Sequence, residues 1–332
     1  MISVKRNKNA IITGTGAALP EQVITNADLE KIVDTSDEWI VSRTGIRERR
    51  KLEEGLSSVD LSEKAAKEAL KNACLTAEEI DLILVATVTP DYPTPSSSCM
   101  LQDRLQAYQA AAMDISAGCT GFVYALAVAQ QFIRNEVYKN ALVIGVEVLT
   151  RVTNWDDRST CVLFGDGAGA VVLQASEEDR GILNISLKAD GRGADLLIVP
   201  AGGSALPASR ETVESNLHTI KMNGNEVFKF ATRAVEDVLM ELFEQENLQP
   251  DALDYLFLHQ ANLRIIEHIR KRLKLPREKV PVNIDLYGNM SSATIPIAMH
   301  EEVISGRLKE GDLIAMVAFG AGLTWGGILL KW

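Results

Sequence analysis

The feature of the sequence that most restricts the fold is a set of matching segments in its two halves. Three pairs of segments match in the same order, 155 to 173 residues apart: DLILV and DYLFL (from Asp81 and Asp254), ALVIG and DLIAM (from Ala141 and Asp312), and FGDGAGAVVL and FGAGLTWGGILL (from Phe164 and Phe319). We expect a duplicated fold of two halves, residues 1–174 and 175–332, related by a pseudo-twofold axis. The alternative is that similar buried strands simply look alike.

Short apolar runs rich in β-branched residues alternate with helical patterns along the chain. Strands are predicted at residues 80–87, 141–146, 253–258 and 313–318, and helices at 62–73, 121–134 and 227–244. Buried strands that alternate with helices indicate an α/β fold with largely parallel sheets. The segment 191–210 is rich in Gly, Pro and Ser and predicts a surface loop, and long loops in compact proteins often serve function.

Composition argues against several classes of protein. The 332 residues are 46% hydrophobic and 24% charged, with a net charge of −11. This balance is typical of a globular chain, and the negative charge argues against nucleic acid or an anionic membrane as a partner. Residues 1–16 contain no signal-peptide core, and no apolar run is long enough to span a bilayer. We therefore expect a cytoplasmic protein.

The four cysteines predict neither a disulfide framework nor a metal site. Cys74, Cys99, Cys119 and Cys161 form no CxxC pair, and none has a His at zinc-ligand spacing. In a cytoplasmic chain we expect reduced thiols, most of them buried as small apolar groups. One of them can serve as a nucleophile.

Cys119 lies in the segment DISAGCTGF, where a strand is predicted to end near Ile115 and a helix to begin at Gly121. The free backbone N–H groups and the dipole at the start of a helix favour a thiolate, so we expect a lowered pKa and an exposed sulfur. Taken alone, the segment fits a packing cysteine at a tight turn as well as it fits a nucleophile.

Two further residues gain meaning beside Cys119. His259 follows the apolar run 255–258, and the carboxyl end of a strand is where α/β proteins place ligand contacts. Asn289 precedes a helix predicted at 293–304 and by itself fits a turn residue or helix cap. Because Asn289 and Cys119 are 170 residues apart, near the repeat offset, we expect equivalent turns that face one pocket. A thiolate with two neutral hydrogen-bonding side chains suits chemistry that forms a thioester and then an enolate.

Two glycine-rich segments need separate interpretation. The segment from Gly14, GTGAAL, is similar to a dinucleotide-binding fingerprint, but Leu19 replaces the third glycine and no acidic residue follows at the right distance. We therefore reject dinucleotide binding. The segment from Phe164, FGDGAG, is predicted to form a tight hairpin packed at the centre of the molecule.

Motifs along the whole chain resemble the β-ketoacyl-acyl carrier protein synthase III family. They are DISAGCTGFVYAL, HQANLRII, YGNMSSATIPIA, FGAGLTWGGILL, FGDGAGAVVL and TSDEWIVSRTGIRERR (residues 35–50). The resemblance implies a homodimer with a five-layered αβαβα thiolase-like architecture. It also implies Cys119 as the acyl-accepting nucleophile and His259 with Asn289 as the pair that assists decarboxylation, where the elongating synthases use two histidines.

The resemblance further implies a set of binding residues. The backbone N–H groups of Cys119 and Ala321 would form an oxyanion hole, with Ala321 in place of a family glycine, and Thr94 of the dimer partner would border the acyl pocket. The residues for coenzyme A are Trp39, Arg43, Arg158 and Asn262, with the adenine between Trp39 and Arg158. Those for acyl carrier protein (ACP) are Arg264, Lys229, Lys271 and Arg272. Arg264, Lys271 and Arg272 belong to a helix predicted within 262–274, whose apolar stripe is Ile266, Ile269 and Leu273.

The implied reaction is a decarboxylative condensation of an acyl-CoA primer with malonyl-ACP through an acyl-cysteine, which initiates fatty acid synthesis without a metal or redox cofactor. Two alternatives are a related condensing enzyme or acyltransferase of a polyketide or quinolone pathway, and a non-catalytic lipid-binding scaffold. Relatives that form hydroxymethylglutaryl-CoA use a glutamate near the nucleophile, and the sequence shows no obvious counterpart. The preferred primer and the pathway of the carrier protein stay open.

Overall fold

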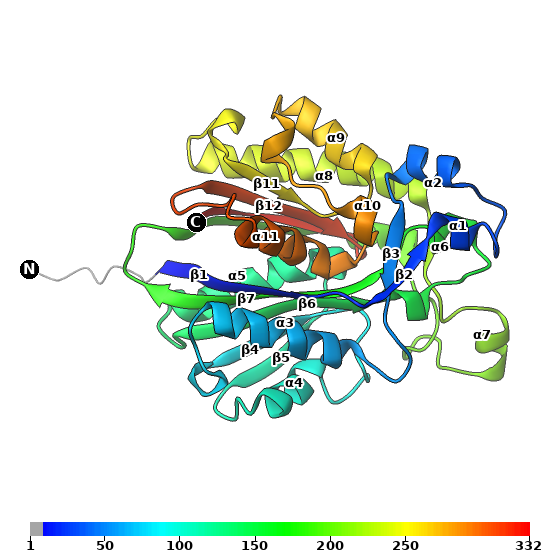
Figure 1. Cartoon of the computed structure of the whole chain (residues 1–332), viewed down its shortest axis with the longest axis horizontal. Helices are drawn as coiled ribbons and strands as arrows, with labels where there is room; N and C mark the ends of the chain where they lie inside the picture. Colours follow the sequence, from blue (N-terminus) through cyan, green and yellow to red (C-terminus); the bar gives the residue numbers. More distant parts are fainter. Residues whose placement is uncertain (1–8) are drawn as a thin grey trace, which may run out of the picture.

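The computed structural model describes residues 9–332, in five alternating layers of helices and sheets (Figure 1). The first sheet has the strand order β1 (Asn9–Ala18), β7 (Asp166–Ser176), β6 (Asn140–Val148), β4 (Leu82–Ala86) and β5 (Ala111–Ile115). The second has the order β11 (Tyr255–Leu258), β12 (Leu313–Gly320), β13 (Thr324–Lys331) and β8 (Gly181–Ala189). The central layer between them contains α5 (Gly121–Arg134) and α11 (Thr294–Ile304).

Two outer helical layers complete the arrangement. Helices α3 (Ser58–Asn72) and α4 (Ser97–Leu105) cover the outer face of the first sheet, and α8 (Gly224–Gln245) and α9 (Leu263–Arg272) cover that of the second (Figure 1). The remaining elements are short: β2 (Gln22–Thr25), α1 (Asn26–Leu29), α2 (Asp37–Thr44), β3 (Glu48–Lys51), α6 (Arg158–Cys161), β9 (Leu197–Ile198), α7 (Arg210–Glu214), β10 (Lys221–Met222) and α10 (Ile284–Tyr287). The predicted αβαβα architecture is confirmed.

The two sheets have equivalent topologies. In the order β1-β7-β6-β4 the first two pairs are antiparallel and the last is parallel, and the order β8-β13-β12-β11 shows the same sequence of pairings. The register also repeats, because Leu82 faces Ala141 across the parallel pair and Tyr255 faces Ile314, each 173 residues further on. The first sheet uses residues 9–176 and the second 181–331, so the expected division at residue 174 lies just inside the end of β7.

The matched Phe-Gly motifs are the exception to this repeat. Phe319 is the last residue but one of β12, and a tight turn leads directly into β13. Phe164, in contrast, precedes β7, and a long connection that contains α6 separates it from the end of β6. The hairpin predicted at Phe164 is therefore wrong, because a short sequence match cannot distinguish the end of one strand from the approach to the next.

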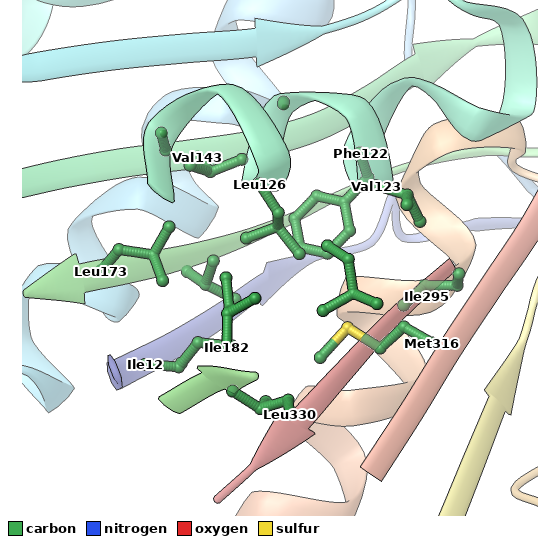
Figure 2. Close-up of a cluster of buried hydrophobic side chains, with 14 of the residues drawn as sticks. Ile12, Phe122, Val123, Leu126, Val143, Leu173, Ile182, Ile295, Met316 and Leu330 are labelled. Atoms are coloured by element: carbon green, nitrogen blue, oxygen red, sulfur yellow. The ribbon is translucent and has the colours of Figure 1, made fainter. Parts of the chain in front are cut away.

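The hydrophobic core follows the alternation of strand side chains. Leu82 and Leu84 of β4 point to the central layer, whereas Ile83 and Val85 point to α3 and α4. Figure 2 shows the central cluster, in which Phe122 of α5 lies among side chains from both sheets. Because both faces of these strands are buried, they are apolar at almost every position, as predicted.

Gly14 and Gly16 have a packing role in β1. A Cβ on Gly16 would lie 2.2 Å from the carbonyl oxygen of Ala65, and one on Gly14 would lie 2.2 Å from that of Ala69. Both carbonyls belong to α3, so these glycines allow the helix backbone to approach the strand.

Two other expectations concern surface segments. The Gly-, Pro- and Ser-rich segment 191–210 is largely exposed and irregular, apart from a short helical turn and β9. Within residues 9–332, no helix is long and apolar enough to cross a membrane. Residues 1–8, part of the segment in which no signal peptide was found, lie outside the described residues.

We predict that Gly16→Ala destabilises the protein by about 1–3 kcal/mol, because the new methyl group overpacks the contact between β1 and α3. Gly203→Ala is the matched control, since a Cβ there would have no heavy atom within 4 Å. Urea unfolding of both variants at one protein concentration provides the measurement. Equal stabilities would contradict the packing role of Gly16.

Candidate active site

Cys119 lies in a one-turn helix, η2 (Gly118–Thr120), between β5 and α5. Gly118 takes a positive φ of 56°, which turns the chain sharply so that Cys119 sits immediately before α5. The Thr324 hydroxyl donates to the Ala117 carbonyl at 2.8 Å and so ties this turn to the β12–β13 hairpin. The predicted place of Cys119 at the start of a helix is confirmed.

The pKa of the Cys119 thiol is raised, whereas its position at the start of a helix predicted a lowered pKa. Burial raises the pKa of Cys119 to about 12, and the charge of Glu147 acts in the same direction. A hydrogen bond with the Ser291 side chain opposes this rise. Cys119 is therefore a neutral thiol near pH 7, because desolvation outweighs the helix terminus.

The β12–β13 hairpin packs directly against the nucleophile turn. A Cβ on Gly320 would lie 2.4 Å from the backbone nitrogen of Cys119, and one on Gly118 would lie 2.7 Å from that of Ala321. The two N–H groups that the family resemblance assigns to an oxyanion hole thus belong to neighbouring segments. Ala321 does not have a positive φ, so the extra methyl group relative to glycine adds no backbone strain.

His259 follows β11 and is almost completely buried. Its backbone N–H donates to Val317 at 2.9 Å, and its ring packs edge-on against Phe319 with centroids 5.3 Å apart. Burial lowers the pKa of His259 to about 3. The imidazole is therefore neutral at pH 7, and its Nδ1 lies 2.8 Å from the Thr294 hydroxyl.

Asn289 is held by its backbone and by its side chain. Its N–H donates to Leu163 at 2.8 Å, and its carbonyl accepts from Gly165 at 3.1 Å. The side-chain Oδ1 accepts from the backbone N–H of Ser291 at 2.8 Å. This contact fixes the orientation of the amide and leaves Nδ2 as the end that can donate to a ligand.

The predicted equivalence of Cys119 and Asn289 is wrong by three residues. The one-turn helices η2 and η7 (Ser291–Ala293) lead into α5 and α11, and their starting residues are 173 apart. Ser292 therefore takes the place of Cys119 in the second half, and Asn289 follows the short helix α10 and not a strand. The two turns nevertheless pack against each other, so the expected single pocket is formed.

Two cavities meet at Cys119. One, of about 310 Å³, is lined mostly by apolar residues: Val88, Gly118, Cys119, Leu149, Val152, Phe164, Leu197, Ile198, Val199, Ile220, Ser291 and Ala321. The other, of about 90 Å³, contains His259 and Asn289 and extends to Phe228, Asn262 and Ile265. The three predicted catalytic side chains thus line a common channel, and residues 197–199 of the predicted surface loop help to form it.

Glu147 is a buried acidic residue that the sequence analysis missed. It lies in β6 with no exposed surface, and burial raises the pKa of its carboxyl to about 7. Glu147 does not line either cavity, so it is not placed to touch a substrate. The available signal was a single charge inside the apolar run ALVIGVEV.

Comparisons with known proteins agree with this geometry. The family model described as 3-oxoacyl-[acyl-carrier-protein (ACP)] synthase III matches residues 113–191, and the model of its C-terminal part matches residues 243–332. The β-ketoacyl-[acyl-carrier-protein] synthase III of Caldanaerobacter subterraneus is 55% identical over 321 residues, 97% of each chain. The chain belongs to the 3-oxoacyl-ACP synthase III family.

Solved structures support the same family and fold. The 3-oxoacyl-[acyl-carrier-protein] synthase III of Aquifex aeolicus is 48% identical, with a TM-score of 0.90 over 97% of this chain and 100% of that one. The priming β-ketosynthase of the R1128 polyketide biosynthetic pathway is 33% identical, with a TM-score of 0.91 over 99% and 98%. The fold of this chain is thus also that of a priming synthase from a polyketide biosynthetic pathway.

The residues assigned to coenzyme A by resemblance to the synthase III family form one cluster. Trp39 of α2 has the guanidinium carbons of Arg43 and Arg158 at 4.8 and 4.9 Å from its ring centroid. A base stacked between Trp39 and Arg158 needs about twice the 3.5 Å van der Waals spacing. Arg158 therefore has to move away from Trp39 before an adenine can enter.

Asn262 connects this cluster to the channel. Its Nδ2 donates to the Arg43 carbonyl at 3.0 Å, and its Oδ1 caps α9 by accepting from the Arg264 N–H at 2.8 Å. Asn262 also lines the smaller cavity. One Nδ2 hydrogen is left to donate to a ligand in the channel.

The four basic residues that the family resemblance assigns to ACP binding lie in two separate places on this chain. Arg264 and Lys229 line a surface hollow next to the channel, and Arg264 lies over the Phe228 ring at 5.6 Å. Lys271 and Arg272 lie two turns further along α9, where Arg272 is 3.7 Å from Glu236. The predicted apolar stripe of α9 is confirmed for Ile266 and Ile269, whereas Leu273 is half-buried.

Thr94, which the resemblance assigns to the acyl pocket, is exposed and does not line either cavity of its own chain. A role in an acyl pocket therefore requires a partner subunit. In the described part of the chain, no three His, Cys, Asp or Glu side chains gather in a way that could hold a metal ion.

The depressed pKa of His259 predicts a pH-dependent change in stability. The unfolded chain takes up a proton below about pH 6.5 and the folded chain does not, so His259 costs stability as the pH falls toward 3. Relative to wild type, His259→Gln should therefore gain about 1–2 kcal/mol between pH 7.5 and pH 5. Urea unfolding at the two pH values measures this difference, and an unchanged difference would contradict neutral burial of His259.

Proposed function

We propose that this chain condenses an acyl-CoA primer with malonyl-ACP, as a β-ketoacyl-ACP synthase III that initiates fatty acid synthesis. The observation that carries the proposal is the convergence of Cys119, His259 and Asn289 on two cavities that meet at the sulfur. One cavity suits an acyl chain because its lining is apolar. The other contains His259 and Asn289 and shares Gly224 and Phe228 with a surface hollow, so it suits an extended thioester arm.

The first half-reaction is acyl transfer to Cys119. The sulfur attacks the thioester carbonyl and CoA leaves. The backbone N–H groups of Cys119 and Ala321 are positioned on adjoining segments to stabilise the oxyanion. The apolar cavity holds the acyl chain, and the cluster of Trp39, Arg43 and Arg158 offers an aromatic face and cations for the nucleotide end of CoA.

The second half-reaction is decarboxylation and condensation. His259 is neutral. It donates through Nε2 in the tautomer whose Nδ1 accepts the single hydrogen of the Thr294 hydroxyl, and that hydrogen then turns away from the Ser291 carbonyl. Asn289 supplies a second donor through Nδ2, because its Oδ1 is held by Ser291. The two donors stabilise the enolate that forms when malonyl-ACP loses CO₂, and the carbanion then attacks the acyl-cysteine.

The proposal includes the partners and the setting of the reaction. The substrates are acyl-CoA and malonyl-ACP, and the working form is a cytoplasmic homodimer in which Thr94 of one subunit borders the acyl pocket of the other. Every bond change is assigned to side chains and backbone groups of the channel, so the mechanism uses no metal or redox cofactor. Neither nucleic acid nor a membrane has a role in it.

A second candidate function is the priming step of a polyketide pathway. The observation in its favour is the 33% identical R1128 priming synthase, which has a TM-score as high as that of the Aquifex enzyme. The two functions share the chemistry and differ in primer and carrier protein. A panel of acyl-CoA primers, each assayed with fatty acid and polyketide carrier proteins, separates them.

We predict that the catalytic residues separate by half-reaction. Cys119→Ala should lose acyl transfer entirely, because it removes the nucleophile. Asn289→Ala should still form an acyl-enzyme but decarboxylate malonyl-ACP about 10²–10³-fold more slowly, because one enolate donor is lost. Rapid-quench mass spectrometry follows the first step and CO₂ release the second. Normal decarboxylation by Asn289→Ala would show that its assigned role is wrong.

We predict that Arg264→Glu raises the KM for malonyl-ACP strongly and changes acylation by acyl-CoA much less. ACP is acidic, and Arg264 lies beside the channel through which its phosphopantetheine arm would enter. Lys309→Glu, the same charge change at an exposed turn before β12, is the control. Both half-reactions are measured at low and moderate salt, since steering weakens with ionic strength. Equal loss in both, or no salt dependence, would exclude this face as the docking site.

A further inference from the structure

The proposed decarboxylation needs the Asn289 amide in one orientation. Its Nδ2 group can donate to a developing enolate, whereas Oδ1 can only accept and would repel the negative charge. The two ends of an amide are so similar in size that packing alone does not distinguish them. Here the Ser291 N–H distinguishes them, because it donates to Oδ1 at 2.8 Å.

This N–H belongs to a residue in an unfavourable backbone conformation. Ser291 has a φ of 47°, in the left-handed region that residues with a Cβ rarely adopt. A conformation of this kind persists where other contacts fix the residue. The Ser291 hydroxyl makes such a contact, because it donates to Glu147 Oε1 at 2.9 Å and both side chains are buried. The carboxyl is therefore the side-chain partner of the residue that orients Asn289.

Strand β6 contacts the turn through two residues. Gly145 and Glu147 are two positions apart and point to the same face of the strand. A Cβ on Gly145 would lie 2.3 Å from the Ser292 carbonyl oxygen, so the glycine lets η7 approach β6 closely. Glu147 then meets the hydroxyls of both serines of η7, since that of Ser292 lies 3.2 Å from Oε1.

The second oxygen of the carboxyl fixes Glu147 from the other side. Oε2 accepts from the Thr89 hydroxyl at 2.7 Å and from the Val88 N–H at 3.1 Å, and the Thr87 hydroxyl lies at 3.3 Å. Residues 87–89 follow directly after β4, a central strand of the first sheet. The carboxyl therefore ties the turn of the second half to the first sheet.

We propose that Glu147 positions the Asn289 amide for decarboxylation by holding the left-handed turn at Ser291. The inference rests on the proposed role of Asn289 as an enolate donor. Glu147 lines neither of the two cavities, so it is a positioning residue that acts through Ser291.

The main chain of Asn289 is held independently of this contact. Its N–H donates to Leu163 and its carbonyl accepts from Gly165. Loss of the Ser291 contact therefore leaves the backbone in place and frees only the side-chain amide. The last torsion of an Asn side chain is broad and roughly two-fold, so a freed amide presents Nδ2 to the substrate only part of the time.

The test measures decarboxylation of malonyl-ACP in a Cys119→Ala parent, where neither a thiol nor an acyl group takes part. The carbanion then takes a proton from water, and the products are acetyl-ACP and CO₂. Ser291→Ala should lower kcat about tenfold and leave KM within about twofold, because the amide is misoriented part of the time. Ser291→Gly should lose no more than about twofold, since glycine adopts a positive φ without steric cost. Ser292→Ala, which removes the other hydroxyl beside Glu147, is the matched control and should keep the kcat of the parent.

An effect that passes through Asn289 also has to be non-additive. In an Asn289→Ala background there is no amide to orient, so Ser291→Ala should cause no further loss. A general loosening of the fold would lower the rate in that background as well.

Glu147→Gln tests the carboxyl itself. The Val88 N–H can only donate, so the single oxygen of the new amide turns toward it and the NH₂ group faces Ser291. The Ser291 hydroxyl then loses its acceptor. We expect kcat to fall about fivefold, and this loss should also vanish in the Asn289→Ala background. If either Ser291→Ala or Glu147→Gln fails to fold, the other decides the test.

The proposal is overturned if Ser291→Ala or Glu147→Gln keeps the kcat of the parent, if Ser291→Gly is no faster than Ser291→Ala, or if the losses multiply with that of Asn289→Ala. A parent that does not decarboxylate malonyl-ACP at all would refute the proposed function instead. Crystal structures then judge the inference alone: the contact between the N–H of residue 291 and Asn289 Oδ1 should be lost in Ser291→Ala and kept in Ser291→Gly. An unchanged contact in Ser291→Ala would overturn it.

Discussion

The left-handed turn at Ser291 is the constraint on which the active site depends. Its N–H holds the Asn289 side chain, its carbonyl accepts from the Thr294 hydroxyl that contacts His259, and its own hydroxyl donates to Glu147. One residue with a positive φ therefore orients Asn289 directly and contacts the Thr294 hydroxyl that lies against His259. The buried carboxyl of Glu147 anchors this turn, which explains why a charge is kept inside an apolar strand.

The duplicated fold brings the parts of this site together. In each half a one-turn helix leads into a helix of the central layer: η2 leads into α5 and η7 into α11. The two one-turn helices pack against each other. The nucleophile therefore comes from one half and the hydrogen-bond donors from the other. The β12–β13 hairpin completes the arrangement, because Gly320 lets the hairpin approach the backbone of Cys119 and Gly118 lets the facing turn approach the backbone of Ala321.

Local signals in the sequence were enough to predict several of the helices and strands. Helix α5 was predicted at the residues where it occurs, and His259 was placed correctly after a strand, because apolar periodicity and turn residues act over short distances. The burial of Glu147 was not predicted, since its partners Thr89 and Ser291 are 58 and 144 residues away. The raised pKa of Cys119 was missed for the same reason, because desolvation depends on tertiary packing. The hairpin at Phe164 failed because a short match ignored the connection that precedes β7.

The central claim is that Cys119 carries the acyl group between two substrates. The most direct measurement mixes the wild-type protein with acyl-CoA, locates the added mass by peptide mapping, and then adds malonyl-ACP. The account predicts one acyl group on the Cys119 peptide, discharged by malonyl-ACP with stoichiometric release of CO₂ and β-ketoacyl-ACP. An acyl group that never forms on Cys119, or one that forms there and is not discharged by malonyl-ACP, would contradict it.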